Sequence, residues 1–263
     1  AGNVAIGSAC LEATTTGAAN VAVGLDALKA NTTASNNTAV GKGALAANTT
    51  GTQNVAIGAT ALDANTTTNN NVAIGFETLT VSTIGDNTAV GASALAANTT
   101  GAYNTAVGKS AMVADTTGTQ NVAVGAFALD ANTTGDKNTA LGYNALTANT
   151  TADFNVAIGR GAMTNNTTGS YNVAVGTGAL DNPSTADNNT AIGYYSMLMN
   201  STGASNVGIG FRALDANTTA SNNVAVGANA MGGNTTGIHN CGFGNAALAA
   251  VTTNSYNTAL GSV

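Results

Sequence analysis

Residues 121–135 read Asn-Val-Ala-Val-Gly-Ala-Phe-Ala-Leu-Asp-Ala-Asn-Thr-Thr-Gly, and close variants of this stretch recur along the whole chain. The Asn that opens each copy recurs every 17 residues from Asn3 to Asn257, with one shorter step of 16 between Asn71 and Asn87. The consensus is N-V/T-A-V-G-x-x-A-L-x-x-N-T-T-G-x-x, and we number its positions 1 to 17 and the successive copies coil 1 to coil 16. Self-similarity this regular predicts a solenoid, in which each repeat forms one coil that stacks on the next.

The repeat length and the residue types predict the kind of coil. Seventeen residues are too few for a helical hairpin, and the β-branched residues at positions 2 and 4 favour strands. We therefore predict an all-β fold, a parallel β-solenoid of the β-roll or β-helix type, with about fifteen coils and two short strands per coil. Turns are expected at the Gly of position 5 and at the Asn-Thr-Thr-Gly run of positions 12 to 15. Residues 1–263 are expected to form a single uncapped domain.

Two apolar columns predict which side chains face inward. Position 4 is always apolar, from Ile6 to Leu260, and position 9 is always Leu or Met. Because side chains alternate along a strand, position 2 should face inward with position 4, and positions 1, 3 and 5 should face the other side. Position 3 is Ala in every coil except for Gly208 and Gly242. Either a sister subunit packs closely against this small-residue stripe, or the stripe faces an interior too narrow for larger side chains.

The composition excludes several partners. Only 7% of the residues are charged, the net charge is −6, and six Lys and Arg residues are too few for a basic stripe along nucleic acid or anionic lipid. No run of 18 apolar residues occurs, so we expect no membrane insertion. The acidic residues of position 10 are separated by neutral coils, which limits repulsion between stacked like charges: Glu12, Asp63, Asp130, Asp181 and Asp215.

Catalytic residue patterns are missing from the sequence. His239 is the single histidine, so the sequence offers little for a histidine-based catalytic triad or metal cluster. Because Cys241 is nearby, we expect His239 to be a loop residue beside a thiol. Gly-x-Gly pairs such as Gly41 and Gly43 follow from the repeat and lack the strand and helix of a phosphate loop. We predict that the chain is not an enzyme and uses no cofactor or metal.

The Asn-Val-Ala-Ile-Gly-Ser-Ala block at residues 3–9 and the Asn-Thr-Ala-Val-Gly blocks resemble the head repeats of trimeric autotransporter adhesins. The longer unit at residues 121–135 is similar to shaft repeats of phage-type tail-fibre proteins. The likeness covers essentially the whole chain. It implies a β-roll, and a role in adhesion or as a fibre shaft, although the chain lacks the coiled-coil stalk and membrane anchor of the adhesins.

Asn-x-Ser/Thr sequons recur at position 12, where they form one column. A coat of glycans along the solenoid is one interpretation, and a turn with a ladder of hydrogen-bonded asparagine side chains is the other. The residues are Asn31, Asn48, Asn65, Asn98, Asn132, Asn149, Asn166, Asn200, Asn217 and Asn234.

Cys10 and Cys241 lie in coils 1 and 15, about 65 Å apart at the usual spacing of stacked strands. A disulfide needs Cα atoms within about 7 Å, so the two cannot pair within one solenoid. Stacking of two copies head to tail would bring them together, which makes an intersubunit disulfide one prediction. Two thiols that replace apolar core residues are the other.

These features together predict a structural protein outside the cell, or on the surface of a cell or virion. We expect a subunit of an extracellular fibre or filament that self-assembles end to end through uncapped solenoid edges, with copies of itself as partners and glycans as candidate partners. The alternative is a trimeric adhesin or tail-fibre shaft that binds a cell-surface receptor through the variable positions 6, 7, 10, 11, 16 and 17. An ice-binding protein is a third hypothesis, although the adjacent Thr residues of positions 13 and 14 point to opposite faces and give no flat Thr-x-Thr surface.

Overall fold

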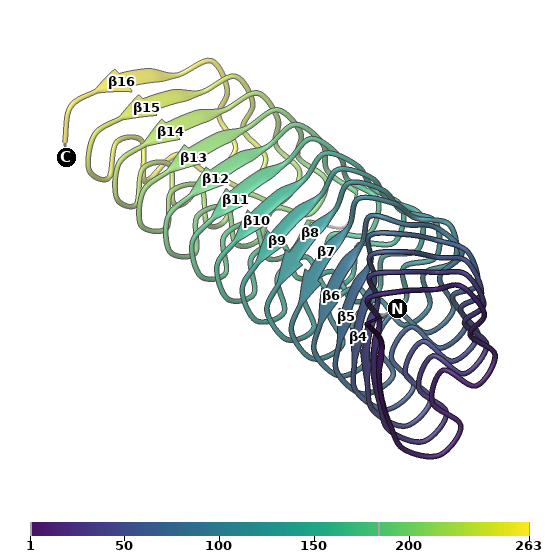
Figure 1. The fold of residues 1–263 in the computed structure, drawn as a ribbon. Helices are drawn as coiled ribbons and strands as arrows, with labels where there is room; N and C mark the ends of the chain where they lie inside the picture. The colour runs from purple at the N-terminus through teal and green to yellow at the C-terminus, as the bar shows by residue number, and fades with distance from the viewer. Residues whose placement is uncertain (1, 184, 263) are drawn as a thin grey trace. The chain divides into compact units, whose positions relative to one another are not determined.

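A computed structural model describes residues 2–183 and 185–262, and Ala1, Ser184 and Val263 lie outside this description. The described residues contain sixteen strands of three residues each and no helix. Two compact units can be distinguished, residues 1–134 and residues 135–263, and each is described by itself. Figure 1 shows that the coils follow one another in chain order within each unit, with one strand arrow per coil.

Each strand occupies positions 2 to 4 of its coil. The first unit contains β1 (Val4–Ile6), β2 (Val21–Val23), β3 (Thr38–Val40), β4 (Val55–Ile57), β5 (Val72–Ile74), β6 (Thr88–Val90), β7 (Thr105–Val107) and β8 (Val122–Val124). The second unit contains β9 (Thr139–Leu141), β10 (Val156–Ile158), β11 (Val173–Val175), β12 (Thr190–Ile192), β13 (Val207–Ile209), β14 (Val224–Val226), β15 (Cys241–Phe243) and β16 (Thr258–Leu260).

Neighbouring strands within each unit pair in parallel, and every residue lies beside its counterpart one repeat away. Val21 of β2, for example, pairs with Val4 of β1 on one side and with Thr38 of β3 on the other. The same register holds from β9 to β16. The predicted parallel β-solenoid with 17-residue coils is therefore confirmed.

Each coil contains one strand, and the predicted second strand around the Leu of position 9 does not form. Residues at positions 7 and 9 adopt left-handed conformations, as Thr60 and Leu62 do with φ of 54° each. A strand needs φ near −120°, so left-handed residues at alternate positions turn the chain instead. The backbone still bonds to the next coil, because Leu62 N–H donates to the carbonyl of Thr78 at 3.0 Å and Ala64 N–H donates to that of Thr80 at 3.1 Å.

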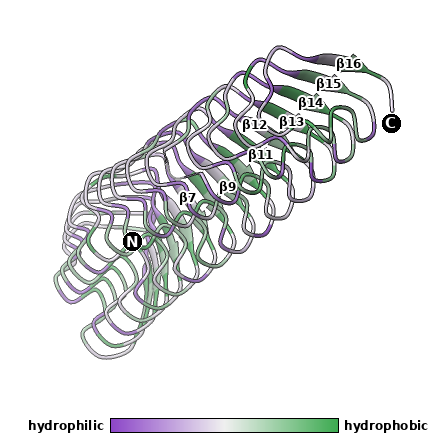
Figure 2. Cartoon of the chain, turned by 180° about the vertical axis from the view of Figure 1, so that it is seen from behind, coloured by the Kyte–Doolittle hydropathy of each residue, from purple (hydrophilic) through white to green (hydrophobic). Residues whose placement is uncertain are grey.

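The interior lies on the opposite side of the strands from the one predicted. Ala89 and Ala106 at position 3 are fully buried, whereas Val122 at position 2 and Ile57 at position 4 are each 38% exposed. The predicted inward orientation of positions 2 and 4 is wrong, and the small-residue stripe faces a narrow interior. The inward orientation of the Leu or Met at position 9 is confirmed. Figure 2 shows β11 to β14 coloured as hydrophobic. In each of these strands the central Ala or Gly is buried, whereas the larger residues on either side of it are more exposed.

The size of the interior explains this reversal. Position 3 touches the position 9 side chain of the preceding coil: a Cβ on Gly208 would lie 2.8 Å from Cγ of Met197. Only a hydrogen or a methyl group fits beside such a Leu or Met, since protein interiors are packed as densely as organic crystals. The branched residues of positions 2 and 4 therefore have room only on the outer face of the sheet.

Candidate functional site

The ten sequon asparagines of position 12 lie inside the coils, and each is fully buried. Nδ2 of Asn48 donates to Oδ1 of Asn31 at 3.3 Å and to the carbonyl of Gly51 in its own coil at 2.9 Å. Asn166 makes the equivalent bonds to Asn149 at 3.3 Å and to Gly169 at 2.8 Å. A glycan on Nδ2 would replace one of these N–H groups and would need space that the closed interior lacks. This burial argues against glycosylation of the folded chain at the same ten residues: Asn31, Asn48, Asn65, Asn98, Asn132, Asn149, Asn166, Asn200, Asn217 and Asn234.

A second asparagine column, at position 1, was expected on the outside and is buried. Oδ1 of Asn37 accepts the backbone N–H of Asn54 in the next coil at 2.9 Å, and Nδ2 of Asn37 donates to the carbonyl of Gly51 at 2.8 Å. The carbonyl of Gly51, at position 15, thus accepts both the position 1 and the position 12 amides of its coil. The position 1 column closes the coils from within, and the position 12 column does so wherever it carries Asn, which is a structural role. The buried members are Asn20, Asn37, Asn54, Asn71, Asn87, Asn104, Asn121, Asn138, Asn155, Asn172, Asn189, Asn206, Asn223 and Asn240.

The 16-residue coil keeps the same closure. The carbonyl of Ile84 accepts Nδ2 of Asn71 at 3.3 Å and Oγ of Ser82 at 2.9 Å, as the position 15 carbonyl does in other coils. The deleted residue is therefore position 14, which is exposed in the complete coils. Val72 of β5 still pairs with Thr88 of β6, so the deletion leaves the register unchanged.

Asp115 replaces Asn in the position 12 column and reverses the direction in which Asn98 donates. Nδ2 of Asn98 donates to Oδ2 of Asp115 at 2.9 Å, and Nδ2 of Asn132 donates to Oδ1 at 2.7 Å. Elsewhere in the column the amides donate to the preceding coil, as Asn132 does here, as Asn65 does to Asn48 at 3.0 Å and as Asn217 does to Asn200 at 2.7 Å. Both carboxylate oxygens accept here, so both neighbours turn their NH₂ groups toward Asp115. Oδ1 of Asn98 consequently makes no hydrogen bond.

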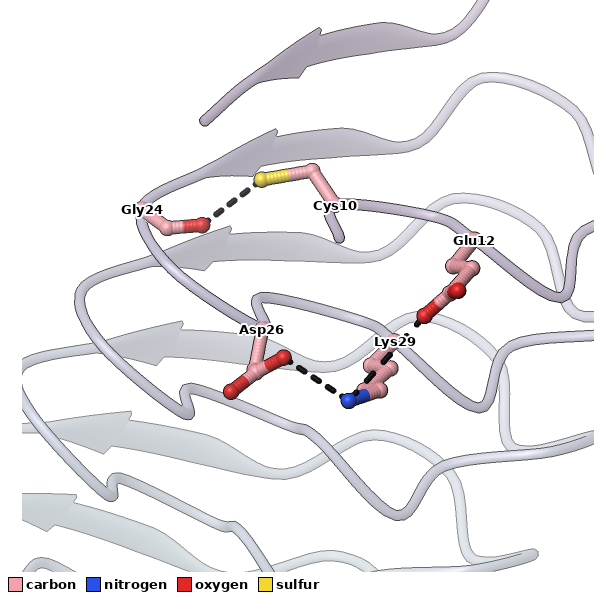
Figure 3. Close-up of polar contacts among 5 residues, drawn as sticks. All are labelled: Cys10, Glu12, Gly24, Asp26 and Lys29. Carbon is pink, nitrogen blue, oxygen red and sulfur yellow. Dashed lines mark hydrogen bonds and ion pairs between the residues drawn. The ribbon is translucent and has the colours of Figure 1, made fainter. Parts of the chain in front are cut away.

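The two cysteines are free and half-buried. The thiol of Cys10, at position 8, points at the carbonyl of Gly24 in the next coil, 2.6 Å away (Figure 3). Cys241 lies in β15 between Val224 and Thr258. They belong to different units, and the intersubunit disulfide between Cys10 and Cys241 stays a prediction.

The threonines of positions 13 and 14 have different environments. Oγ1 of Thr49, at position 13, donates to the carbonyl of Thr66 in the next coil at 3.0 Å, and Thr32 and Thr116 make the same bond. These hydroxyls therefore reinforce the stack. The side chain of position 14 is exposed, as at Thr50. Positions 13 and 14 thus present one exposed threonine column.

Four of the acidic residues of position 10 lie at the edge of the interior, and Glu12 is exposed. Burial raises the pKa values of Asp63 and Asp130, and backbone N–H groups oppose the shift in part. Oδ1 of Asp130 and Oδ1 of Asp181 are buried and make no hydrogen bond. Asp215, by contrast, pairs with Nε of Arg212 at 2.7 Å.

Aromatic side chains form exposed stacks at the variable positions. At position 17, Phe154 and Tyr171 lie with ring centroids 5.0 Å apart and nearly parallel, and Nζ of Lys137 lies 4.7 Å from the Phe154 centroid. His239 stacks on Tyr256 at 5.1 Å in the same way. Stacked rings and a cation over a ring are favourable contacts in themselves, so these columns stabilise the stack as well as shape its surface.

The described residues contain no group of three or more His, Cys, Asp and Glu side chains that could hold a metal ion. No helix with the length and hydropathy of a membrane span occurs in the described part of the chain. Comparison of the sequence with protein-family models and with curated proteins finds no match. The resemblance to adhesin and tail-fibre repeats therefore remains a prediction from the sequence.

Proposed function

We propose that the chain is a structural subunit of an extracellular fibre, in which solenoids of this kind join end to end. The observation that carries the proposal is the recurrence of the same backbone and asparagine bonds from coil to coil. Val21 N–H donates to the following coil at 2.9 Å and Gly24 N–H to the preceding coil at 2.8 Å, and equivalent bonds recur through both units. A stack of this type gains stability with every added coil, which suits a long, narrow mechanical element.

The self-similarity of the coils supports end-to-end joining. Because successive coils present the same donors and acceptors on their two faces, the upper face of one coil complements the lower face of any other. A second copy would extend the ladder with the same bonds, as an added strand extends the edge of a sheet. We therefore expect copies of the chain to polymerise head to tail.

Electron microscopy of the purified protein tests this function. We expect unbranched filaments that lengthen as the protein concentration rises. A folded domain fused ahead of residue 1 should block the growth, whereas the same domain inserted after the exposed Thr50 should not, because position 14 tolerates deletion in coil 5. Discrete particles of constant length at all concentrations would count against the proposal.

A trimeric adhesin or tail-fibre shaft is the second candidate, and the outer face of the strands favours it. Positions 2 and 4 carry no charged residue in any coil, and several of their apolar side chains are exposed. A row of uncharged residues with exposed apolar side chains among them suits a protein interface, and copies of the chain could associate side by side through it. Sedimentation analysis should then give a defined trimer that Ile57→Lys dissociates and Ala59→Lys does not, since Lys42 and Lys109 already occupy the position of Ala59. A monomer in the unmodified protein would remove this candidate.

Ice binding has no comparable support, because the position 13 hydroxyls are hydrogen-bonded within the stack. It stays a prediction from the sequence.

A further inference from the structure

A hollow of about 230 Å³ lies on the surface of coils 9 to 12, at positions 6, 7 and 10. It forms because position 7 is Gly161 in coil 10 and Gly178 in coil 11: Gly161 leaves open space, and Gly178 leaves room for the ring of Tyr195. Asn144 and Tyr195 occupy position 7 in the coils on either side and form its two ends. All of these residues belong to the unit of residues 135–263.

An aromatic ring forms one wall of the hollow. A Cβ on Gly178 would overlap the ring of Tyr195, so this ring lies directly against the backbone of the preceding coil. Tyr195 also contacts Tyr194 with centroids 4.1 Å apart, and Tyr194 stacks on Phe211 at 5.7 Å. The ring of Tyr195 is therefore held in place, and Tyr143 adds a second aromatic residue to the lining.

The lining of the hollow includes a carboxylate. Asp181 belongs to the lining, and its Oδ1 is buried without a hydrogen bond. Two coils further on, Arg212 at position 7 pairs with Asp215 at position 10. Coil 11 has Gly178 where that arginine would be, so its own coil supplies no such partner to Asp181. Oδ1 of Asp130, at the same position in coil 8, is buried in the same way, so a ligand hydroxyl in the hollow would be accepted by the other carboxylate oxygen of Asp181.

A cation lies in the same lining. Arg160, at position 6 of coil 10, belongs to the lining, and none of the ion pairs between described residues includes it. A guanidinium group offers five N–H donors in a planar fork that matches a carboxylate. The hollow thus combines a held aromatic ring, a carboxylate that can accept a ligand hydroxyl and a guanidinium that can bind a ligand carboxylate, and Thr164 and Thr177 complete its lining.

We propose that this hollow binds a single sugar ring that carries a carboxylate, such as a uronic acid. Asp181 accepts a ring hydroxyl, Arg160 pairs with the carboxylate, and the apolar face of the sugar packs on an aromatic ring. A volume of about 230 Å³ suits one ring rather than a larger ligand. The inference is independent of whether the chain forms filaments or trimers, because all the contributing residues lie in one chain.

Saturation-transfer NMR titrations with glucuronic acid and glucose test the proposal. One ring in an open site is expected to bind with a dissociation constant on the order of 1 mM. Glucuronic acid should bind at least tenfold more tightly than glucose. Arg160→Gln should abolish this preference, and Asp181→Ala should weaken binding of both sugars about tenfold.

Two controls keep the result interpretable. Arg212→Gln removes an arginine outside the hollow and should leave both affinities unchanged. Asp181→Ala should fold normally, because Ala46 and Ala96 occupy the same position in other coils, and an unchanged melting temperature checks this. Absence of saturable binding, or binding that both lining variants leave unchanged, would overturn the proposal. Filament formation is scored separately by microscopy of the same samples.

Discussion

At the scale of single residues, the most constrained side chain is the buried Leu or Met of position 9. Leu28, Leu95 and Met112 have φ of 50°, 53° and 51°, in the left-handed region. A side chain branched at Cβ is strongly disfavoured there, whereas Leu and Met branch further out or not at all. Val and Ile are apolar enough for a buried site, so burial does not explain their absence from position 9. The left-handed backbone conformation does.

Substitutions at Leu62 test this explanation. Leu62 is fully buried and has φ of 54°. We expect Leu62→Met to lower the free energy of unfolding by less than about 1.5 kcal/mol, because the volume is conserved. Leu62→Ile should cost about 2–4 kcal/mol, because left-handed strain adds to the repacking. Urea unfolding followed by circular dichroism measures both, and equal costs would argue against backbone control.

The glycines of coil 3 give a matched pair of sites. Gly41 has φ of 135°, and a Cβ there would lie 2.5 Å from the carbonyl oxygen of Gly58. Gly43 has φ of 68°, and its Cβ would meet only a methyl group of Thr60 at 3.7 Å. Gly41→Ala should therefore cost about 3 kcal/mol or more, and Gly43→Ala about 1 kcal/mol. Similar melting temperatures for the two variants would contradict this difference.

Asp130 makes the stability of the folded chain depend on pH. Burial raises its pKa above the ordinary 3.8, so the folded state binds the proton more tightly than the unfolded state. The stabilising contribution is present below the unfolded pKa and is lost as the pH rises through the folded pKa. Asp130→Asn should therefore raise the melting temperature at pH 7, with the gain shrinking toward about pH 3. The exposed Glu77→Gln serves as control, and a gain from Asp130→Asn that grows on acidification would contradict the assignment.

At the scale of the coil, the asparagine columns take the place of a larger apolar core. Each closes a loop onto the position 15 carbonyl and bonds to the next coil, so their loss leaves buried backbone groups without partners. Asn37→Ala should cost about 2–4 kcal/mol, because the N–H of Asn54 loses its acceptor and the carbonyl of Gly51 loses a donor. The adjacent Asn36 is exposed and at a position that is Ala19 in coil 1, so Asn36→Ala should cost about 1 kcal/mol or less. Thermal unfolding compares them, and equal losses would refute the closing role.

Much of the coil could be predicted from the sequence. The strict period predicts the stacking, the β-branched residues predict the strand of positions 2 to 4, and the constant Leu or Met of position 9 predicts an inward side chain. The period, however, identifies which residues share a column and does not say which side of a strand is inside. Val, Ile and Leu at position 4 are larger and more apolar than Ala at position 3. Hydrophobicity therefore predicts that position 4 faces the interior, which is wrong.

Left-handed conformations could not be derived from residue type alone. Position 7 is Asp26, Phe127 and Arg212 in different coils, yet all have φ between 52° and 58°. The Asn, Asp and Gly residues that recur at positions 7 and 17 were the available signal, since these types adopt positive φ most readily. The hollow of coils 9 to 12 depends on two glycines that are unremarkable in sequence and adjacent only once the coils stack.

At the scale of the whole chain, the same contacts recur in both units, so stability should be a sum of coil and neighbour terms. The central claim is that the coils stack with Asn, Ala and Leu inside and with Val, Thr and Ile outside. The sequence pattern instead predicts that position 2 faces the interior. The two alternatives differ in the solvent accessibility of a side chain at position 2, which can be measured.

Thiol labelling in a background without Cys10 and Cys241 tests the claim most directly. Val122→Cys changes an exposed position 2 that is cysteine in coil 15, and Ala94→Cys changes a fully buried position 8 that is cysteine in coil 1. We predict that the thiol of Val122→Cys reacts with an aqueous reagent nearly as fast as in the unfolded chain. The thiol of Ala94→Cys should react at least a hundredfold more slowly. Fast labelling of Ala94→Cys and protection of Val122→Cys in the folded protein would contradict the account.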